Sequence, residues 1–167
     1  MDISALSFYA GYAFCQAVYV QSILESDALM VPYVVDWGEG GPHASPYPAQ
    51  TQADAVQLQI EAIKAIEHDS RAWSAGRDGL LKRSDGSEID VLVITAGAEG
   101  VKHNLEVMHM YKTTPFTLVG NFIVQPPHDA FLEEQGGNRN FFSNFVEGVK
   151  AHRFSDSCMG YVENKEK

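Results

Sequence analysis

The chain has 167 residues, of which 45% are hydrophobic and 20% charged, and its formal net charge at pH 7 is −10. This composition is typical of a folded protein and excludes intrinsic disorder; the length fits a single globular domain over residues 1–167. The negative charge argues against nucleic-acid binding, which needs a basic patch. It favours a basic protein partner instead.

The first long segment, from Ile3 to Leu24, contains no charged residue. Its interspersed polar residues make it a poor membrane span, and Asp2 does not fit the basic start of a secretory signal. We therefore expect a buried helix in a cytoplasmic protein that has no membrane contact. Small residues on two opposite faces allow close approach of neighbours, so the helix over residues 3–24 either packs in the core or forms a homodimer contact.

Hydrophobic periodicity and turn residues divide the first hundred residues into alternating elements. The expected elements are a strand over 29–35, a loop over 36–50, a helix from 51 to between 68 and 76, and a hairpin with strands 80–83 and 88–95. Thr51 fits the N-cap of the helix, with Asp54 in the third helical position. The apolar stripe of this helix is expected at Ala53, Val56, Ile60 and Ile63, and it is widened by Leu58, Ala62 and Ile66.

The second part of the chain predicts further helices and strands. The expected elements are a helix over 101–111, a strand over 116–124, a short helix from 126 through 134, a helix that begins at 138 or 140, and an edge strand over 157–162. Helices at the ends and strands in the middle indicate an α+β domain. We expect a mixed sheet of about four or five strands packed with three or four helices.

The turn from Gly97 to Gly100 is the first candidate site. A loop that leads into a helix presents free N–H groups to an anion. The preceding run, Asp90 to Gly97, resembles a nucleotide-side strand of malate and lactate dehydrogenases, and this resemblance would imply dinucleotide binding. The glycine-rich fingerprint of that family is absent upstream, and Glu99 would repel an anion. We therefore expect no cofactor.

A second candidate is a polar series at a spacing of three residues, His103, Glu106 and His109. Imidazole and carboxylate groups are suitable ligands for zinc or iron. The alternative is the solvent-facing side of an amphipathic helix. Because helical metal pairs more often use a spacing of four residues, we expect no metal here.

The two cysteines, Cys15 and Cys158, lie near opposite ends of the chain. Cys15 could act as a nucleophile with His103, His109 or His128 as its base. Its expected place in the middle of a helix removes help from the helix N-terminus, and the alternative is a small buried side chain. A bridge between the two cysteines stays open, although a reducing cytosol is the simpler expectation.

The segment between residues 36 and 50 combines polar and aromatic side chains. Asp36, Glu39 and His43 could perform acid–base catalysis or bind a metal. Trp37 and Tyr47 could pin the loop or anchor a partner.

These observations predict a small acidic protein that acts by binding a macromolecular partner, in an inhibitor or immunity-type role, rather than by catalysis. The alternative is a small hydrolase or ligand-binding enzyme that uses the 36–50 loop and the turn from Gly97 to Gly100. A site would then be expected where that turn meets the loop.

Overall fold

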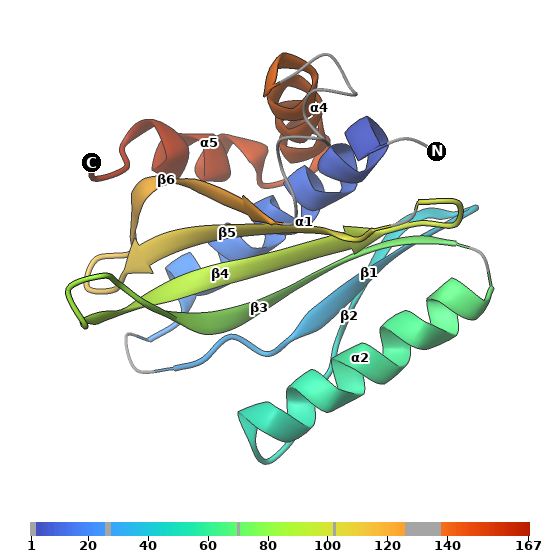
Figure 1. Cartoon of the computed structure of the whole chain (residues 1–167), viewed down its shortest axis with the longest axis horizontal. Helices are drawn as coiled ribbons and strands as arrows, with labels where there is room; N and C mark the ends of the chain where they lie inside the picture. Colours follow the sequence, from blue (N-terminus) through green and yellow to red (C-terminus); the bar gives the residue numbers. More distant parts are fainter. Residues whose placement is uncertain (1–2, 26–27, 70, 102, 126–137) are drawn as a thin grey trace.

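A six-stranded antiparallel sheet separates two layers of helices (Figure 1). The computed structural model describes residues 3–25, 28–69, 71–101, 103–125 and 138–167. The strands are β1 (Tyr33–Gly38), β2 (Gly41–Pro46), β3 (Ala72–Lys82), β4 (Glu88–Gly97), β5 (Leu105–Lys112) and β6 (Thr117–Gln125), in the order β2-β1-β3-β4-β5-β6. The α+β class is confirmed. The sheet has six strands rather than four or five, and the pairings between these strands are antiparallel.

Three helices cover the first face of the sheet: α1 (Ile3–Ile23), α4 (Asn138–Ala151) and α5 (Ser155–Glu163) (Figure 1). Fully buried side chains of α1, such as Leu6 and Phe14, join the inward residues of β4, β5 and β6 in one core. α1 and α4 touch through their backbones, because a Cβ added at Gly148 would lie 1.9 Å from the carbonyl oxygen of Phe8. The predicted helix is confirmed, and it packs against both α4 and the sheet.

A single described helix, α2 (Gln52–His68), lies on the second face, against β1 and β3 (Figure 1). The Thr51 hydroxyl accepts the Asp54 N–H at 3.1 Å, so the expected N-cap is confirmed. The expected stripe is only partly right: Ile66 is buried, but the other buried residues are Ala55 and Gln59, and Ile60 is 40% exposed. Gln59 is turned inward because its amide donates to the carbonyls of Tyr33 and Gly76, at 2.9 Å each.

The segment 36–50 is not a long loop, which corrects the sequence prediction. Residues 33–46 form the hairpin β1–β2, whose turn closes at Gly41 with φ +87°. Pro42 and Pro46 lie in β2, which is an edge strand and therefore tolerates residues without an N–H. The hairpin at 83–88 and the strands β4 and β6 follow the expected pattern.

The expected helix over 101–111 is wrong, because residues 105–112 form β5. Leu105, Val107, His109 and Tyr111 are buried, and the residues between them are less so. This is the two-residue period of a strand. The prediction placed Met108 on the buried side and His109 on the polar side, whereas in the strand His109 is buried and Met108 is less so.

The expected edge strand over 157–162 is also wrong, because these residues belong to α5. Backbone atoms of Glu166 instead cover part of the free edge of β6: its carbonyl accepts from Gly120 and its N–H donates to Leu118, both at 2.8 Å. The helix that begins at Asn138 is confirmed, with Phe141 and Phe145 buried. The short helix expected from 126 through 134 lies outside the described residues.

Candidate functional site

The part of the second sheet face that α2 leaves open forms a groove against that helix. The groove has a volume of about 670 Å³, within the range of about 300–1,000 Å³ that small-ligand sites occupy. Its apolar lining comes from Val56, Ile60 and Ile63 of α2 and Trp73 of β3. The groove exists because α2 packs over β1 and β3 at one side of a six-stranded sheet.

Trp73 lines this groove and is almost completely buried. It is 2% exposed, and its indole Nε1 has no hydrogen-bond partner among the described residues. A buried N–H without an acceptor costs about 1–3 kcal/mol, so a bound group that supplied an acceptor would recover that energy. The indole of Trp37, by contrast, donates to the Ser74 hydroxyl at 3.1 Å.

Gly97 shapes the groove by its lack of a side chain. A Cβ at this position would lie 2.7 Å from the ring of Trp73 and 2.6 Å from Oδ1 of Asn104. Gly97 therefore admits the indole against the β4 backbone. No helix follows Gly100, because the chain continues into β5, so the anion site expected at a helix N-terminus does not form there.

Charged side chains of both signs line the groove: Lys64 and Glu67 on α2, Arg77 on β3 and Glu106 on β5. The Arg77 guanidinium donates to the carbonyl of Asp78 at 3.3 Å. Within the described part of the chain, Lys64, Glu67 and Glu106 form no ion pair. These three groups are free to pair with a bound partner or ligand.

The strand register relates the groove to the residues that the sequence singled out. His43 of β2 pairs with Asp36 of β1, Asp36 pairs with Trp73 of β3, and Trp73 pairs with Gly97 of β4. These four residues form one row across the sheet. The sequence predicted a site where the Gly97 turn meets the segment after Val35. In the sheet, Gly97 and Asp36 lie two strands apart in this row, with Trp73 between them.

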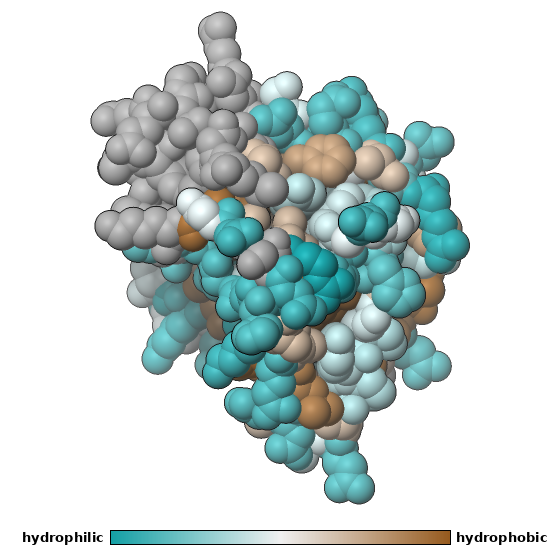
Figure 2. Space-filling view, turned by 90° about the vertical axis from the view of Figure 1, so that its right-hand side faces the viewer, coloured by the Kyte–Doolittle hydropathy of each residue, from teal (hydrophilic) through white to brown (hydrophobic). Residues whose placement is uncertain are grey.

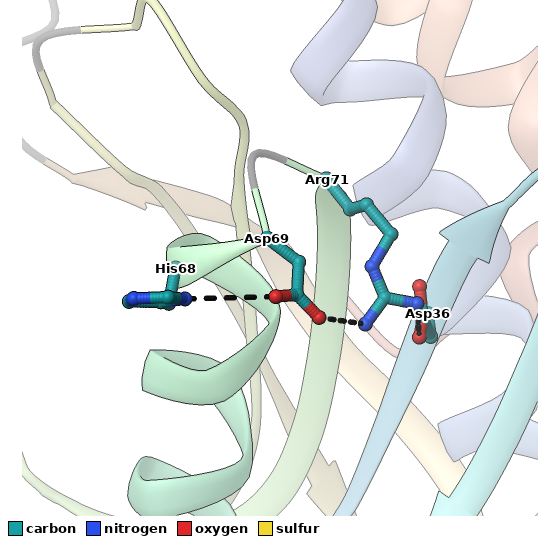
Figure 3. Close-up of polar contacts among 4 residues, drawn as sticks. All are labelled: Asp36, His68, Asp69 and Arg71. Carbon is teal, nitrogen blue, oxygen red and sulfur yellow. Dashed lines mark hydrogen bonds and ion pairs between the residues drawn. The ribbon is translucent and has the colours of Figure 1, made fainter.

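Asp36, the second residue of this row, is held in an ion-pair network. Arg71 donates to Asp36 at 2.5 Å and to Asp69 at 3.1 Å, and His68 lies 3.6 Å from Asp69 (Figure 3). Arg71 thus neutralises the Asp36 carboxylate and ties β1 to the connection between α2 and β3.

The surface seen from the right-hand side of Figure 1 is largely hydrophilic, with scattered apolar side chains (Figure 2).

The other residues expected in the 36–50 segment are spread over the hairpin. Glu39 lies in its turn, and His43 is exposed. Trp37 packs against three aromatic rings of α1, with centroid distances of 4.8–5.7 Å. Tyr47 packs against the small core beneath α2. Trp37 therefore belongs to the core on the first face, and Tyr47 supports the second.

The three residues considered as metal ligands, His103, Glu106 and His109, lie on opposite faces of the sheet. His103 and Glu106 line the groove, whereas His109 is 1% exposed and packs between Phe14 and Phe122 on the first face. Burial lowers the pKa of His109, with a smaller contribution from the positive Lys165. Among the described residues no group of three or more His, Cys, Asp or Glu side chains is arranged to hold a metal ion.

Cys15 lies in the core on the first face, in contact with a histidine that the sequence analysis did not consider. Cys158 of α5 and His152, in the connection between α4 and α5, lie close enough to affect the pKa of Cys15. The hydrogen bond from Cys158, supported by His152, lowers the pKa of Cys15; the same pairing and burial raise the pKa of Cys158. Of the bases expected for Cys15, His103 lies at the groove on the opposite face, and His128 is outside the described residues.

Trp73, Gln59 and His152 are the site residues that sequence reasoning missed. Trp73 stands in the run Ala-Trp-Ser-Ala-Gly, whose small residues show no alternating pattern of apolar and polar side chains that would indicate a strand. Gln59 interrupts an apolar stripe, and His152 lies far from Cys15 along the chain. The only available signal was a tryptophan shortly before the Asp85-Gly86 hairpin turn.

Comparison with known proteins adds no family. The chain matches no family model, and neither a curated protein nor a solved structure is significantly similar to it. None of the described helices is long and apolar enough to cross a bilayer.

Proposed function

We propose that this protein acts by binding another protein, and that the partner docks in the groove between α2 and the open sheet face. The observation that carries this proposal is the buried indole N–H of Trp73, which has no acceptor among the described residues and belongs to a side chain that lines the groove beside Ile60 and Ile63. A main-chain carbonyl of a docked segment is a suitable acceptor, and an apolar side chain of that segment would contact Ile60 and Ile63.

The charge of the molecule supports a basic partner. The net charge of −10 would accelerate encounter with a positively charged surface. Glu67 and Glu106 line the groove and form no ion pair with any described residue, so they are available to basic side chains. Binding should therefore weaken as ionic strength rises.

The proposal also includes a cellular location and an oligomeric state. A cytoplasmic location is compatible with two unpaired, buried thiols. A homodimer through residues 3–24 stays a prediction, which sedimentation of the purified protein at several concentrations would test.

Site-specific photo-crosslinking in the native host tests the docking site. A photoreactive residue in place of Ile60, which lines the groove, should capture one protein of discrete mass. The matched control is the same residue in place of Leu80, which is 67% exposed on β3. Capture at both positions, or at neither, would contradict the proposal.

A spectroscopic measurement then locates the contact. The chain has two tryptophans, so a ¹H–¹⁵N spectrum shows two indole signals, which Trp37→Phe and Trp73→Phe variants assign. Addition of the captured partner should shift the signal of Trp73 and leave that of Trp37, already bonded to Ser74, unchanged. A shift of both signals alike would indicate a global rearrangement instead of docking.

A small-molecule ligand is the second candidate function, favoured by the groove volume of about 670 Å³. It would supply the same acceptor to Trp73 without a protein partner. Native mass spectrometry of protein purified from its host distinguishes the two: a bound mass of a few hundred daltons that is lost in Trp73→Phe supports the ligand.

A further inference from the structure

The second face of the sheet carries an apolar strip beside the groove that no described helix covers. α2 packs on β1 and β3, whereas β4, β5 and β6 extend beyond it on this side (Figure 1). The apolar strip consists of two rows across these strands, Val93–Met108–Ile123 and Val91–Met110–Val119. We infer, on the premise of the proposed function, that a basic amphipathic helix of the partner protein lies on this strip beside α2, with its C-terminal end in the groove.

The strand register places the apolar strip on the same side of the sheet as the groove. Arg77, which lines the groove, pairs with Val93, and paired residues share a face. A Cβ added at Gly79 would lie 2.9 Å from a methyl group of Val93 and 3.2 Å from a methyl group of Val91. Neither valine belongs to the core on the first face or to the small core beneath α2. The two valines therefore form the floor of a surface that continues the groove.

Methionine side chains form the outer layer of the apolar strip. Met108 and Met110 are partly buried, as is Ile123 on the neighbouring strand. A Cβ added at Gly120 of β6 would lie 3.0 Å from the terminal methyl carbon of Met110, so this side chain reaches across to the next strand. Unbranched methionine side chains adapt to the apolar residues of a partner.

The hydrogen bonding and the width of the apolar strip favour a helix as its occupant. Strands β4 and β5 are paired on both sides within the sheet, so a segment laid on this face finds no backbone partner there. A helix satisfies most of its own N–H and C=O groups, whereas an extended segment would leave them unpaired. The two spacings across three strands amount to about 10 Å. This is close to the diameter of one helix with its side chains, about 10–12 Å.

The groove determines which end of the helix enters it. The last four carbonyl groups of a helix have no intrahelical partner, so one of them can accept the indole N–H of Trp73. The partial negative charge of a helix C-terminus is favoured by cations, and Lys64 and Arg77 both line the groove. Glu67 and Glu106 in the same lining attract basic side chains of the last helical turn. A helix that enters by its C-terminal end therefore matches the charges of both signs.

The length of the helix follows from the strand that it accompanies. Trp73 pairs with Gly97 at one end of the surface, and Gly79 pairs with Val91 at the other. The six positions between Trp73 and Gly79 span about 20 Å of strand, which about 13 helical residues cover. A second copy of this chain is a poorer occupant, because each copy carries a net charge of −10.

A synthetic peptide of about 14 residues serves as the probe. Leucines occupy one helical face of this ordered peptide and lysines its last turn, and both of its ends are blocked. In spectra of the native protein, the methyl signals of Met108 and Met110 should shift together with the indole signal of Trp73. The signals of Met30 and Met159, which belong to the first face, should stay unchanged. A peptide of the same composition in scrambled order is the control.

The outcomes separate this inference from the proposed function. A shift of the Trp73 signal alone would overturn the helix on the apolar strip and leave docking in the groove intact. Unshifted methionine signals, or equal effects of the ordered and scrambled peptides, would also overturn the helix. Methionine shifts that appear when the protein is concentrated without peptide would assign the strip to a second copy and overturn it. Failure of the proposed function itself is read from the crosslinking at Ile60.

Substitutions at Met110 test the contact directly. Met110→Lys should weaken binding of the ordered peptide by about tenfold, because it places a like charge beneath the peptide. Met110→Leu conserves the volume and should bind as the native protein does. Leu80→Lys adds the same charge at an exposed position of β3 and is the control. Equal weakening by the two lysine variants would overturn the inference, and circular dichroism verifies that each variant is folded.

A second peptide tests the direction of the helix. It keeps the leucine face and has its lysines in the first turn instead of the last. This peptide should bind more weakly than the ordered one, because its basic residues lie away from Glu67 and Glu106. Equal or tighter binding would overturn entry by the C-terminal end.

Discussion

The two faces of the sheet differ in how completely they are covered. On the first face, α1, α4 and α5 enclose a continuous core that includes Phe14 and Phe145 and most of the inward residues of β4–β6. On the second face, the core beneath α2 consists of four buried residues, Val34, Ile66, Trp73 and Ala75. The first face therefore carries most of the hydrophobic stabilisation, and the second has an open groove available for binding. Substitutions on each face test this division.

The largest difference is expected when a core side chain is truncated. Phe14 is fully buried and its ring centroid lies 5.1 Å from that of Phe122 and 5.5 Å from that of Phe145. Phe14→Ala should lower the free energy of unfolding by about 3–5 kcal/mol, as large-to-small core changes do. Ile63→Ala, at the partly buried groove wall, should cost about 1 kcal/mol. Urea unfolding measures both, and equal losses would contradict the division between the faces.

A smaller effect is expected where α1 and α4 meet through their backbones. A methyl group at Gly148 would overlap the carbonyl of Phe8, so Gly148→Ala should cost about 1–3 kcal/mol through overpacking. Gly160 of α5 has no atom within 4 Å of an added Cβ. The matched variant Gly160→Ala should instead stabilise the protein by about 0.5–1 kcal/mol. A loss of stability in both variants would mean that packing does not distinguish the two glycines.

The sequence predicted some helices and strands correctly and misread others. α1, α4 and the strands β4 and β6 were recognisable because their apolar residues satisfy a helical or strand period within one element. β5 was misread because His109 is buried against aromatic rings, and a single sequence does not reveal such a neighbour. α5 was misread because its place depends on contact with α1 and α4. These errors come from tertiary contacts overriding local pattern.

The candidate sites were harder to predict, for a related reason. Asp36, His43 and Gly97 were named from composition, and the sheet register does bring them into one row. Trp73, the residue between them, drew no attention because its position in β3 has no alternating pattern. Cys15 and Cys158 were both named, with a bridge between them left open, but the nearby His152 was not considered. Long-range pairings of this kind follow from topology.

The smallest expected effect concerns a carboxyl group buried on the first face. Asp78 is 7% exposed and accepts hydrogen bonds from the Met30 N–H at 2.6 Å and the Tyr111 hydroxyl at 2.7 Å. Burial raises the pKa of Asp78, although both hydrogen bonds oppose that shift. Its protonated form is therefore favoured by the fold. The stability it contributes is fully present below the ordinary pKa of an unfolded aspartate, about 3.9, and is lost as the pH rises through the raised value.

The variant Asp78→Asn isolates this dependence, since the amide is neutral at every pH. The free energy of unfolding of the variant relative to the native protein should increase as the pH rises from about 4 to 7. Asp85→Asn is the control, because hydrogen bonds from Ser87 lower the pKa of this exposed carboxyl. Any pH dependence there should have the opposite sign and be weakened by solvent. Urea unfolding at a series of pH values measures both, and a constant difference for Asp78→Asn would show that burial on the first face does not disfavour its charge.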